Sequence, residues 1–487
     1  MPGPSSDLPA RLRAALVAAD FTYDAVAELL GPVAHAALGR NETTPGLRRT
    51  TDGGPLATLT RLFLLQAPVD LPAAERALPG LVDRLAVEGF LERSVGQVAA
   101  RLDVRPYAAD DQHLWVVSDL TPGLDGSGNR VGQDHVLGIS AASTSLAQLT
   151  VREPVGRSLD LGTGCGVQAL HLATHSDAVV ATDVNRRALR LARFNAEINE
   201  APAPVDVREG SFFDPVAGER FDLISTNPPF VISPATGSRL VYRDSGLPGD
   251  RVVEHIVRAA PDHLTDGGWC QVLANWVIAD GVPWADRLAG WVPEGTDAFV
   301  VQREVLDPAA YVELWLKDEG RHGGPDYAAR YDTWLSWFDD QGVEAVGFGW
   351  INLRRSGGSR RELLEWPYDV EQPIAPAIRD WARGTDAQVG LDSRLVRRPD
   401  VRQETLGEPG AEDPETVVLR QQRGLRRARQ VDTVEAALVG ACDGELSVGR
   451  ILDAVAQLLG ADPGATRAAY LPAVTELVAE GFLDPAG

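Results

Sequence analysis

The chain has 487 residues, more than a single hydrophobic core usually serves, so two to four domains are expected. Its composition, 44% hydrophobic and 24% charged, is normal for a globular protein. A net charge of −23 argues against a surface built throughout for nucleic acid, although it leaves room for a local basic site.

Cysteine usage and hydropathy indicate a cytoplasmic protein. Cys165, Cys270 and Cys442 lie far apart and form no CxxC pair, so neither a disulfide framework nor a zinc site is predicted. The amphipathic stretch from Leu8 to Ala19 is too polar for a signal peptide, and no later run reaches membrane-spanning length. We therefore expect a reducing compartment, no metal and no membrane partner.

Residues 1–125 are predicted to form a helical and winged-helix-like module for a substrate or partner. Apolar periodicity predicts a helix over Leu8–Ala19, and a second helix near Asp24–Leu30 should stop at the Gly-Pro pair that follows it. A polar stretch, residues 41–55, precedes a denser apolar block that extends to residue 91.

One pattern occurs near both ends of the chain. Residues 81–91 and 473–483 each predict a helix that is ended by a glycine and followed by Phe-Leu at the start of a strand. Both copies resemble the third helix and wing of winged-helix modules. Because both lie in acidic surroundings, a structural or protein-docking role is favoured over DNA reading. A second winged-helix-like domain is expected at 431–487, after a Gly-, Pro- and Arg-rich extension or linker at 354–430.

Strands and helices alternate in the segment 126–353, which predicts an α/β fold with a doubly wound, Rossmann-like parallel sheet. The expected strands are Ser158–Leu161, Ala178–Thr182, Phe221–Ser225, Cys270–Ala274, Phe299–Val305 and Val343–Leu353. Helices are expected at Gln168–Ala173, Ala309–Lys317 and Tyr331–Asp340. The tryptophans at 315, 334, 337 and 350 are expected to form the core of an added subdomain.

A glycine-rich loop follows the first of these strands. The sequence DLGTGCG, residues 160–166, lies between a strand and a helix, where glycines allow a tight turn and close approach of a ligand to the backbone. Its GxGxG spacing, with Val167 next, does not fit the GxGxxG dinucleotide pattern. Asp183, at the end of the next strand, stands where a ribose-binding carboxylate is expected. The alternative interpretation of Asp183 is a helix N-cap.

The sequence Asn227-Pro228-Pro229-Phe230 follows a third strand. A planar NH₂ nitrogen is a poor nucleophile because its lone pair is delocalised, and hydrogen bonds from its N–H groups to fixed acceptors would turn that lone pair toward an electrophile. The Asn227 side-chain oxygen and the Pro228 carbonyl are suitable acceptors. The two prolines restrict the loop, and Phe230 can stack on the planar group. The alternative is a tight turn with no chemical role.

Together these elements, within residues 157–275, resemble the class I S-adenosylmethionine (SAM)-dependent methyltransferases with an NPPF or NPPY motif. The most similar groups are the release-factor glutamine methyltransferases and the small-domain ribosomal-RNA guanine-N2 methyltransferases. Residues 243–250, the segment Ile256–Leu264 and the turn at 266–269 resemble the former group. Phe230 and the strand Val272–Asn275 resemble the latter, although Val231 stands where those enzymes often carry His.

The resemblance implies SAM as the cofactor and assigns residues to it. The implied cofactor-binding residues are Asp160, Gly162, Thr163, Gly164, Gly166, Asp183, Ser211, Asn227 and Thr144. In this assignment the glycines line the methionine part, Asp183 holds the ribose and Thr144 caps the cofactor. Ser211 stands where relatives usually carry an Asp that meets the adenine. The implied catalytic residues are Asn227, Pro228, Pro229 and Phe230.

The sequence therefore predicts an enzyme, a SAM-dependent N-methyltransferase acting on a planar NH₂ group. A protein glutamine, such as that of a translation release factor, is the leading acceptor. The alternative is a guanine N2 or adenine N6 of ribosomal RNA, for which the arginine clusters at 354–361 and 420–429 are candidate contacts. A further alternative is a winged-helix regulator that senses SAM without using it. The intact NPPF motif argues against a sensor, which needs no acceptors aimed at a nitrogen.

Overall fold

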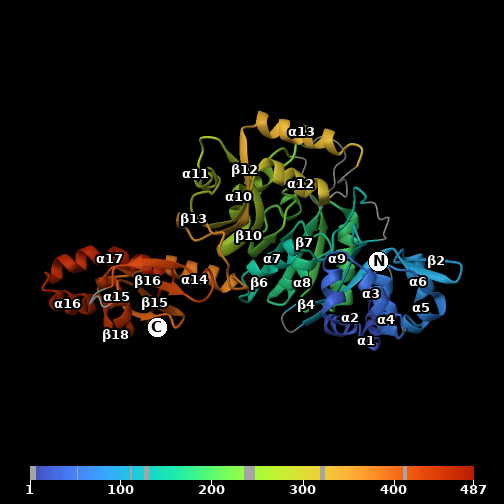
Figure 1. Cartoon of the computed structure of the whole chain (residues 1–487), viewed down its shortest axis with the longest axis horizontal. Coiled ribbons are helices and arrows are strands. Elements are labelled where there is room, and N and C mark those ends of the chain that lie inside the picture. The colour runs from blue at the N-terminus through green and yellow to red at the C-terminus, as the bar shows by residue number, and fades with distance from the viewer. Residues whose placement is uncertain are drawn as a thin grey trace. The chain divides into compact units, whose positions relative to one another are not determined.

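The computed structural model describes residues 7–51, 53–109, 112–125, 131–234, 247–318, 324–409 and 414–486. The chain divides into two compact units (Figure 1). The first unit takes in residues 1–147 and 152–366, and the second takes in residues 148–151 and 367–487. The expected module 1–125 and core 126–353 thus share the first unit. Most of the expected extension, 354–430, folds with residues 431–487 in the second.

An eight-stranded mixed sheet forms the centre of the first unit. Its strands, in spatial order, are β13 (Arg361–Glu365), β11 (Asp297–Leu306), β12 (Val343–Arg354), β10 (Leu264–Ala279), β9 (Phe221–Thr226), β6 (Val155–Leu161), β7 (Ser176–Asp183) and β8 (Val205–Glu209). β6 to β10 run parallel to one another, and β12 pairs antiparallel with β10 and β11. The strand order reverses at β6, so the carboxyl ends of β6, β7 and β9 flank a switch point where such sheets bind ligands. The predicted Rossmann-like fold is confirmed.

Helices separate these strands. They are α7 (Ala141–Leu149), α8 (Val167–Ala173), α9 (Arg186–Ile198), α10 (Arg251–Ala259), α11 (Trp284–Ala289), α12 (Pro308–Asp318) and α13 (Tyr327–Asp340), with short 3-10 turns at Asp214–Val216 and Ala260–His263. α10 buries its aliphatic face against a core cluster that includes residues of β6, β9 and β10. α12 and α13 form the added subdomain expected from the tryptophans, and they pack on β12 around Trp334 and Phe338.

Short helices and small sheets make up the N-terminal part of the first unit. They are α1 (Leu8–Ala18), α2 (Tyr23–Leu38), α3 (Thr44–Arg49), α4 (Pro55–Leu59), a π-helix (Thr60–Leu64), β1 (Val69–Asp70), α5 (Leu71–Ala77), α6 (Val82–Val87), β2 (Leu91–Ser94), β3 (Gln97–Ala100), β4 (Leu102–Ala109) and β5 (Gln112–Asp119). Gly31, at φ +69°, interrupts α2 where the sequence predicts a helix end, but the chain then resumes a helix to Leu38. β1, β3 and β2 form one antiparallel sheet, and β4 pairs with β5 as a hairpin.

Two asparagines on α9 join this hairpin to the core. Asn195 Oδ1 accepts the Val117 N–H and Asn195 Nδ2 donates to the Val117 carbonyl, each at 2.8 Å. Asn199 makes the same pair of 2.8 Å bonds with Trp115. The two asparagines are four residues apart on the helix, a rise of about 6 Å, and their partners are two residues apart on the strand, a rise of about 6.6 Å. The two spacings are nearly equal, so both asparagines can bond to the strand edge at once. The N-terminal part is therefore fixed against the helix that follows β7.

The repeated sequence pattern has the same local structure in both units. α6 is followed by Gly89 (φ +80°), and the Phe90 N–H donates to the carbonyl of Leu85 at 2.8 Å. After α17 (Pro463–Ala479), Gly481 (φ +79°) and Phe482 repeat this bond at 2.8 Å. A glycine at positive φ satisfies the last carbonyls of a helix and turns the following apolar residue inward. Both phenylalanines are buried.

The second unit contains two small sheets and several helices. Its elements are α14 (Ala375–Asp386), β14 (Arg394–Arg397), β15 (Val401–Leu406), β16 (Thr416–Gln421), β17 (Ala428–Val431), α15 (Thr433–Ala441), β18 (Asp443–Ser447), α16 (Val448–Leu459), α17 and β19 (Leu483–Pro485). β14 lies between β18 and β19 in one sheet, and β15, β16 and β17 form the other. Residues 367–430, expected as an extension or linker, thus contain a helix and four strands among the described residues.

The three cysteines are free and buried. Among the described residues, no helix has both the length and the apolar character needed to cross a membrane. Within the same ranges, no group of three or more His, Cys, Asp and Glu side chains is arranged to hold a metal ion.

Candidate active site

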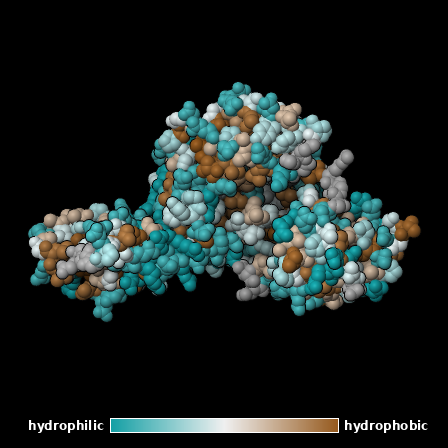
Figure 2. Space-filling view, in the orientation of Figure 1, coloured by the Kyte–Doolittle hydropathy of each residue, from teal (hydrophilic) through white to brown (hydrophobic). Residues whose placement is uncertain are grey.

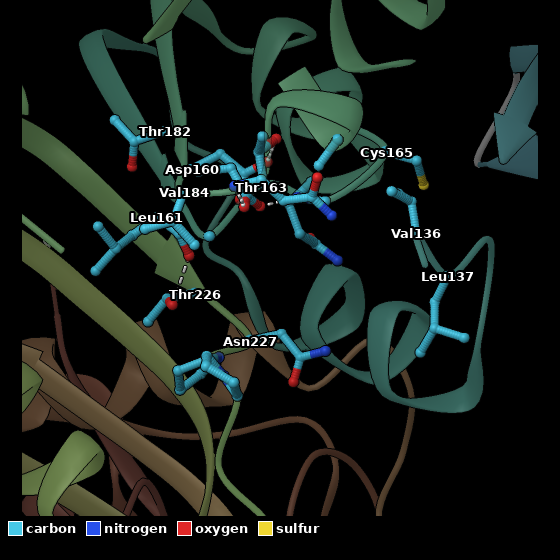
Figure 3. Close-up of a pocket in the computed structure, with 18 of the residues that line it drawn as sticks. Val136, Leu137, Asp160, Leu161, Thr163, Cys165, Thr182, Val184, Thr226 and Asn227 are labelled. Atoms are coloured by element: carbon cyan, nitrogen blue, oxygen red, sulfur yellow. Dashed lines mark hydrogen bonds between the residues drawn. The ribbon is translucent and has the colours of Figure 1, made fainter. Parts of the chain in front are cut away.

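A cavity of about 360 Å³ lies at the carboxyl ends of β6, β7 and β9. This volume falls within the roughly 300–1,000 Å³ of small-molecule sites. In the view of Figure 3, Asn227 lies below Asp160 and Thr163, and Val136 and Leu137 lie to the right. The residues predicted from sequence that line the cavity are Asp160, Gly162, Thr163, Gly164, Asp183, Ser211, Asn227, Pro228 and Pro229.

The glycines of the 160–166 loop have two different roles. Gly162 and Gly164 line the cavity at φ +75° and +55°, and a Cβ atom at either would meet no other atom within 4 Å. The space beside them is therefore open to a ligand. Gly166 is different, because its Cβ would lie 3.1 Å from Cα of Ala192 on α9. It allows α8 and α9 to pack closely and is not among the lining residues.

Asp160 holds the shape of this loop. Its Oδ2 accepts a hydrogen bond from the Thr163 hydroxyl at 2.5 Å and another from the Ala169 N–H at 2.9 Å. Complete burial raises the pKa of Asp160 to about 7, and the nearby Asp183 adds to the rise. The carboxyl therefore joins the strand end, the loop and the start of α8.

Asp183 stands at the end of β7 with its carboxylate at the cavity. Its two oxygens accept hydrogen bonds from the Gly164 N–H at 2.9 Å and the Asn185 N–H at 2.8 Å. Burial raises the pKa of Asp183, and the backbone donors oppose that rise. The N-cap of α9 is Asn185, whose side chain accepts from the Arg187 N–H. Asp183 is therefore not the cap, and its carboxylate lines the cavity.

The loop that begins at Asn227 is held at its start. Thr226 Oγ1 donates to the Leu161 carbonyl at 2.7 Å, which joins the ends of β9 and β6 (Figure 3). Asn227 Oδ1 is buried and has no hydrogen-bond partner among the described residues. Leaving a buried acceptor unpaired costs about 1–3 kcal/mol, so this oxygen fits a donor from a bound molecule. Phe230 is not a lining residue; it is partly buried and packs against the core cluster that includes residues of β6, β9 and β10.

Of two further residues predicted to bind the cofactor, Ser211 lines the cavity and Thr144 does not. Thr144 does not line it; its hydroxyl donates to the Ser140 carbonyl at 3.1 Å, while Ser140 and Ser143 are the lining residues of that segment. Ser211 lines the cavity next to Phe212. Of the stretch 243–250, residues 243–246 lie outside the described residues.

One wall of the cavity was missed by sequence reasoning. Residues 135–138 line it, and the Val136 N–H donates to Asp119 Oδ2 at 2.8 Å. Asp119 is at the end of β5, and both of its carboxylate oxygens accept from Arg187 Nε, each at 3.0 Å. Arg187 belongs to α9, so this ion pair connects the wall to the helix after Asp183. A single Asp at a strand end carries no pattern that would reveal it.

The residues present fit a SAM-like ligand. Two open glycines allow close approach to the backbone, a buried carboxylate can accept from hydroxyl groups, and an unpaired buried oxygen lies nearby. Gly162, Gly164, Asp160 and Asp183 would hold the cofactor. A ligand of this class therefore matches the donors and acceptors around the cavity.

Family comparison agrees with this geometry. Residues 138–279 match the methyltransferase small domain. Residues 18–101 and 377–485 match two domains of unknown function, DUF7059 and DUF7782. The methyltransferase small-domain match spans β6 to β10 and includes the glycine loop, Asp183 and Asn227. This central domain is therefore a class I SAM-dependent methyltransferase domain, a class whose cofactor is S-adenosylmethionine.

Individual relatives match about a quarter of the chain. The chain is 39% identical over 139 residues to the release factor glutamine methyltransferase of Yersinia pestis, covering 26% of this chain and 49% of that protein. It is 37% identical over 126 residues to the ribosomal protein uL3 glutamine methyltransferase of Bradyrhizobium diazoefficiens, covering 23% and 39%. A solved T. thermophilus 16S rRNA N2 methyltransferase is 17% identical with a TM-score of 0.27, over 48% of this chain and 60% of that one. The chain spans about half or less of the length of these two curated relatives.

Proposed function

We propose that the chain is an N-methyltransferase that places a methyl group on a planar NH₂, with a protein glutamine side chain as its leading acceptor. The observation that carries this proposal is the buried, unpaired Oδ1 of Asn227 at the cofactor cavity. The release factor and uL3 relatives, which are named for glutamine methylation, support the choice of acceptor.

The residues of this chain would orient the acceptor nitrogen. The Asn227 side-chain oxygen and the Pro228 carbonyl would accept its two N–H groups, so that its lone pair points toward the cavity. Bound SAM would supply the methyl group from its sulfonium and leave as the neutral thioether S-adenosylhomocysteine, and the methylated nitrogen would release one of its two protons to solvent. Because the acceptors are fixed before the reaction, they would stabilise the positive charge that develops on the nitrogen and would cost little reorganisation. Asp160 and Asp183 would position the cofactor.

A ribosomal RNA amine is the second candidate, because guanine N2 and adenine N6 present the same planar group. The arginine clusters give it little support. Arg361 Nη2 donates to the Val292 carbonyl at 2.7 Å, and Arg420 Nε lies 2.7 Å from Glu404 Oε1. Arginines engaged in this way are less available to phosphates, which supply most nucleic-acid affinity. We therefore favour the protein acceptor.

The two repeated elements support winged-helix modules in both units. Each comprises a helix, a glycine turn and a strand that joins a three-stranded sheet. The exposed positions of α6 and its wing include Asp83, Val87, Glu88 and Val95. An acidic and apolar surface suits a protein partner better than DNA. The buried free cysteines suit a reducing cytoplasm.

Methyl transfer from labelled SAM tests the proposal. The purified chain is incubated with tritiated-methyl SAM and, in separate reactions, a bacterial translation release factor, protein uL3 and ribosomal RNA. We expect label in a protein, released on hydrolysis as N5-methylglutamine. Label confined to RNA would reverse the order of acceptors, and SAM binding with no transfer to any of them would favour the sensor.

A further inference from the structure

The segment after Asn227 is held by one tyrosine hydroxyl from a distant helix. Tyr311 lies on α12 and is fully buried. Its hydroxyl oxygen accepts a hydrogen bond from the Ile232 N–H at 2.9 Å. It also accepts one from Asn275 Nδ2 at 3.2 Å. A single oxygen thus connects the 227–232 loop, β10 and the inserted helix.

The surroundings leave this oxygen little freedom. The Tyr311 ring contacts Phe338 and Phe348, with ring centroids 6.0 and 5.7 Å away. Val231 and Ile232 are buried in the same cluster, which α12, α13 and β12 form. Figure 2 shows hydrophobic residues gathered around the position of α12 on the visible face of the first unit. The loop therefore packs against a close-packed wall that resists small displacements.

The consequence for the site follows from chain connectivity. Thr226 fixes the loop at one end and the Ile232 N–H fixes it at the other. Between them, Pro228 and Pro229 restrict φ, so few conformations remain for Asn227. A shift of the loop by about 1 Å would misdirect both acceptors and is enough to lower a rate by roughly a hundredfold.

We propose that Tyr311 is a positioning residue for methyl transfer, and that the α12–α13 insertion sets the geometry of the acceptor loop through its hydroxyl. The inference rests on the proposed function, because Asn227 must hold an acceptor for its position to matter. It assigns a chemical role to a segment outside the methyltransferase small domain, which ends at residue 279. Asn275 shares this role through the same oxygen.

The test compares Tyr311→Phe with Tyr331→Phe. Both variants keep an aromatic ring on the inserted helices and lose one hydroxyl. The Tyr331 hydroxyl donates to Glu313 Oε1 at 3.0 Å and lies 3.5 Å from the Ala309 carbonyl, so its hydrogen bonds join α13 to α12 and do not reach the 227–232 loop. Hydrogen exchange of the segment 226–234 is measured in the full chain, with melting temperature and SAM affinity as controls. We expect Tyr311→Phe to speed exchange of the Ile232 amide by roughly tenfold or more. Tyr331→Phe should leave it unchanged.

Kinetics with a bacterial translation release factor add a second readout. Tyr311→Phe should lower kcat by roughly tenfold to a hundredfold, with SAM affinity unchanged and KM for the release factor little altered. Unchanged exchange at Ile232, or an unchanged kcat in an active enzyme, would overturn the positioning role. If the wild-type chain transfers no methyl group, the proposed function fails, and the exchange result still decides whether Tyr311 holds the loop.

Discussion

The cavity proposed for the cofactor takes its walls mainly from residues close together in sequence, whereas the proposed acceptor loop, residues 227–232, is fixed by residues far apart. The 160–166 loop and the residues Thr182 and Asp183 lie at the carboxyl ends of two neighbouring strands, and backbone N–H groups of the loop donate to the Thr182 carbonyl and the Asp183 carboxylate. The loop at 227–232 is bonded to Tyr311 of α12, whose hydroxyl is in turn bonded to Asn275 of β10. The residues around the cavity can therefore stay the same while changes in the α12–α13 insertion alter the position of the 227–232 loop. Separate variants should therefore affect cofactor binding and methyl transfer independently.

The largest expected effect is on the cofactor side. Gly164→Leu places a side chain in the cavity and should abolish measurable SAM binding, because nothing else occupies that space. Gly218→Leu is the matched control, since Gly218 also has positive φ (+78°) and open space but does not line the cavity. Both variants carry similar backbone strain. Calorimetric titration with SAM should separate them, and equal affinity in the two would show that the cavity is not the cofactor site.

The next largest effect should appear on the acceptor side. Asn227→Ala should lower kcat by roughly a hundredfold or more, because it removes a preorganised transition-state contact. SAM affinity should stay nearly constant. Asn227→Asp keeps an oxygen acceptor and should retain more activity than the alanine variant. Equal turnover by wild type and Asn227→Ala in a release-factor assay would contradict the assigned role.

A smaller loss is expected at Asp183. Asp183→Ala removes a charged acceptor for ribose hydroxyls and should weaken SAM binding by about 1.5–3 kcal/mol. Asp177→Ala is the control, because Asp177 is exposed at the opposite end of the same strand. Calorimetry on both variants gives the difference directly. If the Asp183 variant binds SAM as tightly as the control, Asp183 does not contact the ribose.

A final effect, on folding stability rather than on binding or turnover, is a dependence on pH. Burial raises the pKa of Asp160 from 3.8 to about 7, so the folded protein retains a proton that the unfolded chain releases. The resulting stabilisation is complete below about pH 4 and is lost as the pH rises through about 7, at up to about 1.4 kcal/mol per pH unit. Asp160→Asn should remove this part of the slope. Denaturant unfolding of the cofactor-free proteins across that range measures it, and parallel slopes in both proteins would argue against a raised pKa.

Sequence patterns located residues that line the cavity far better than the contacts that hold the 227–232 loop. A strand, a glycine loop and an acidic residue after the next strand have short, regular spacings, so Gly162, Gly164 and Asp183 could be found by pattern. Gly166 fits the same pattern, but its small size is needed for packing against Ala192. Residue spacing alone does not distinguish a glycine that leaves room for a ligand from a glycine that allows two helices to pack closely.

The remaining features depend on long-range packing. Phe230, predicted to stack on the planar acceptor, is partly buried against a core cluster and does not line the cavity, and its local sequence does not specify which way a strand-end aromatic turns. The Asn195–Val117 bond joins residues 78 positions apart, and Tyr311 lies 79 positions from Ile232. Such contacts leave no periodicity in the sequence. β8 and β13 were missed because they are short and only partly buried.

The central claim, methyl transfer to a planar nitrogen, is tested most directly by observing the nitrogen itself. A translation release factor labelled with nitrogen-15 in its glutamine side chains is incubated with the chain and SAM, and its proton–nitrogen correlation spectrum is recorded. The account predicts that the paired NH₂ signals of one glutamine are replaced by a single N–H signal, and that Asn227→Ala prevents this change. An unchanged spectrum with the wild-type chain saturated in SAM, or a methyl group found on an oxygen or carbon atom, would contradict it.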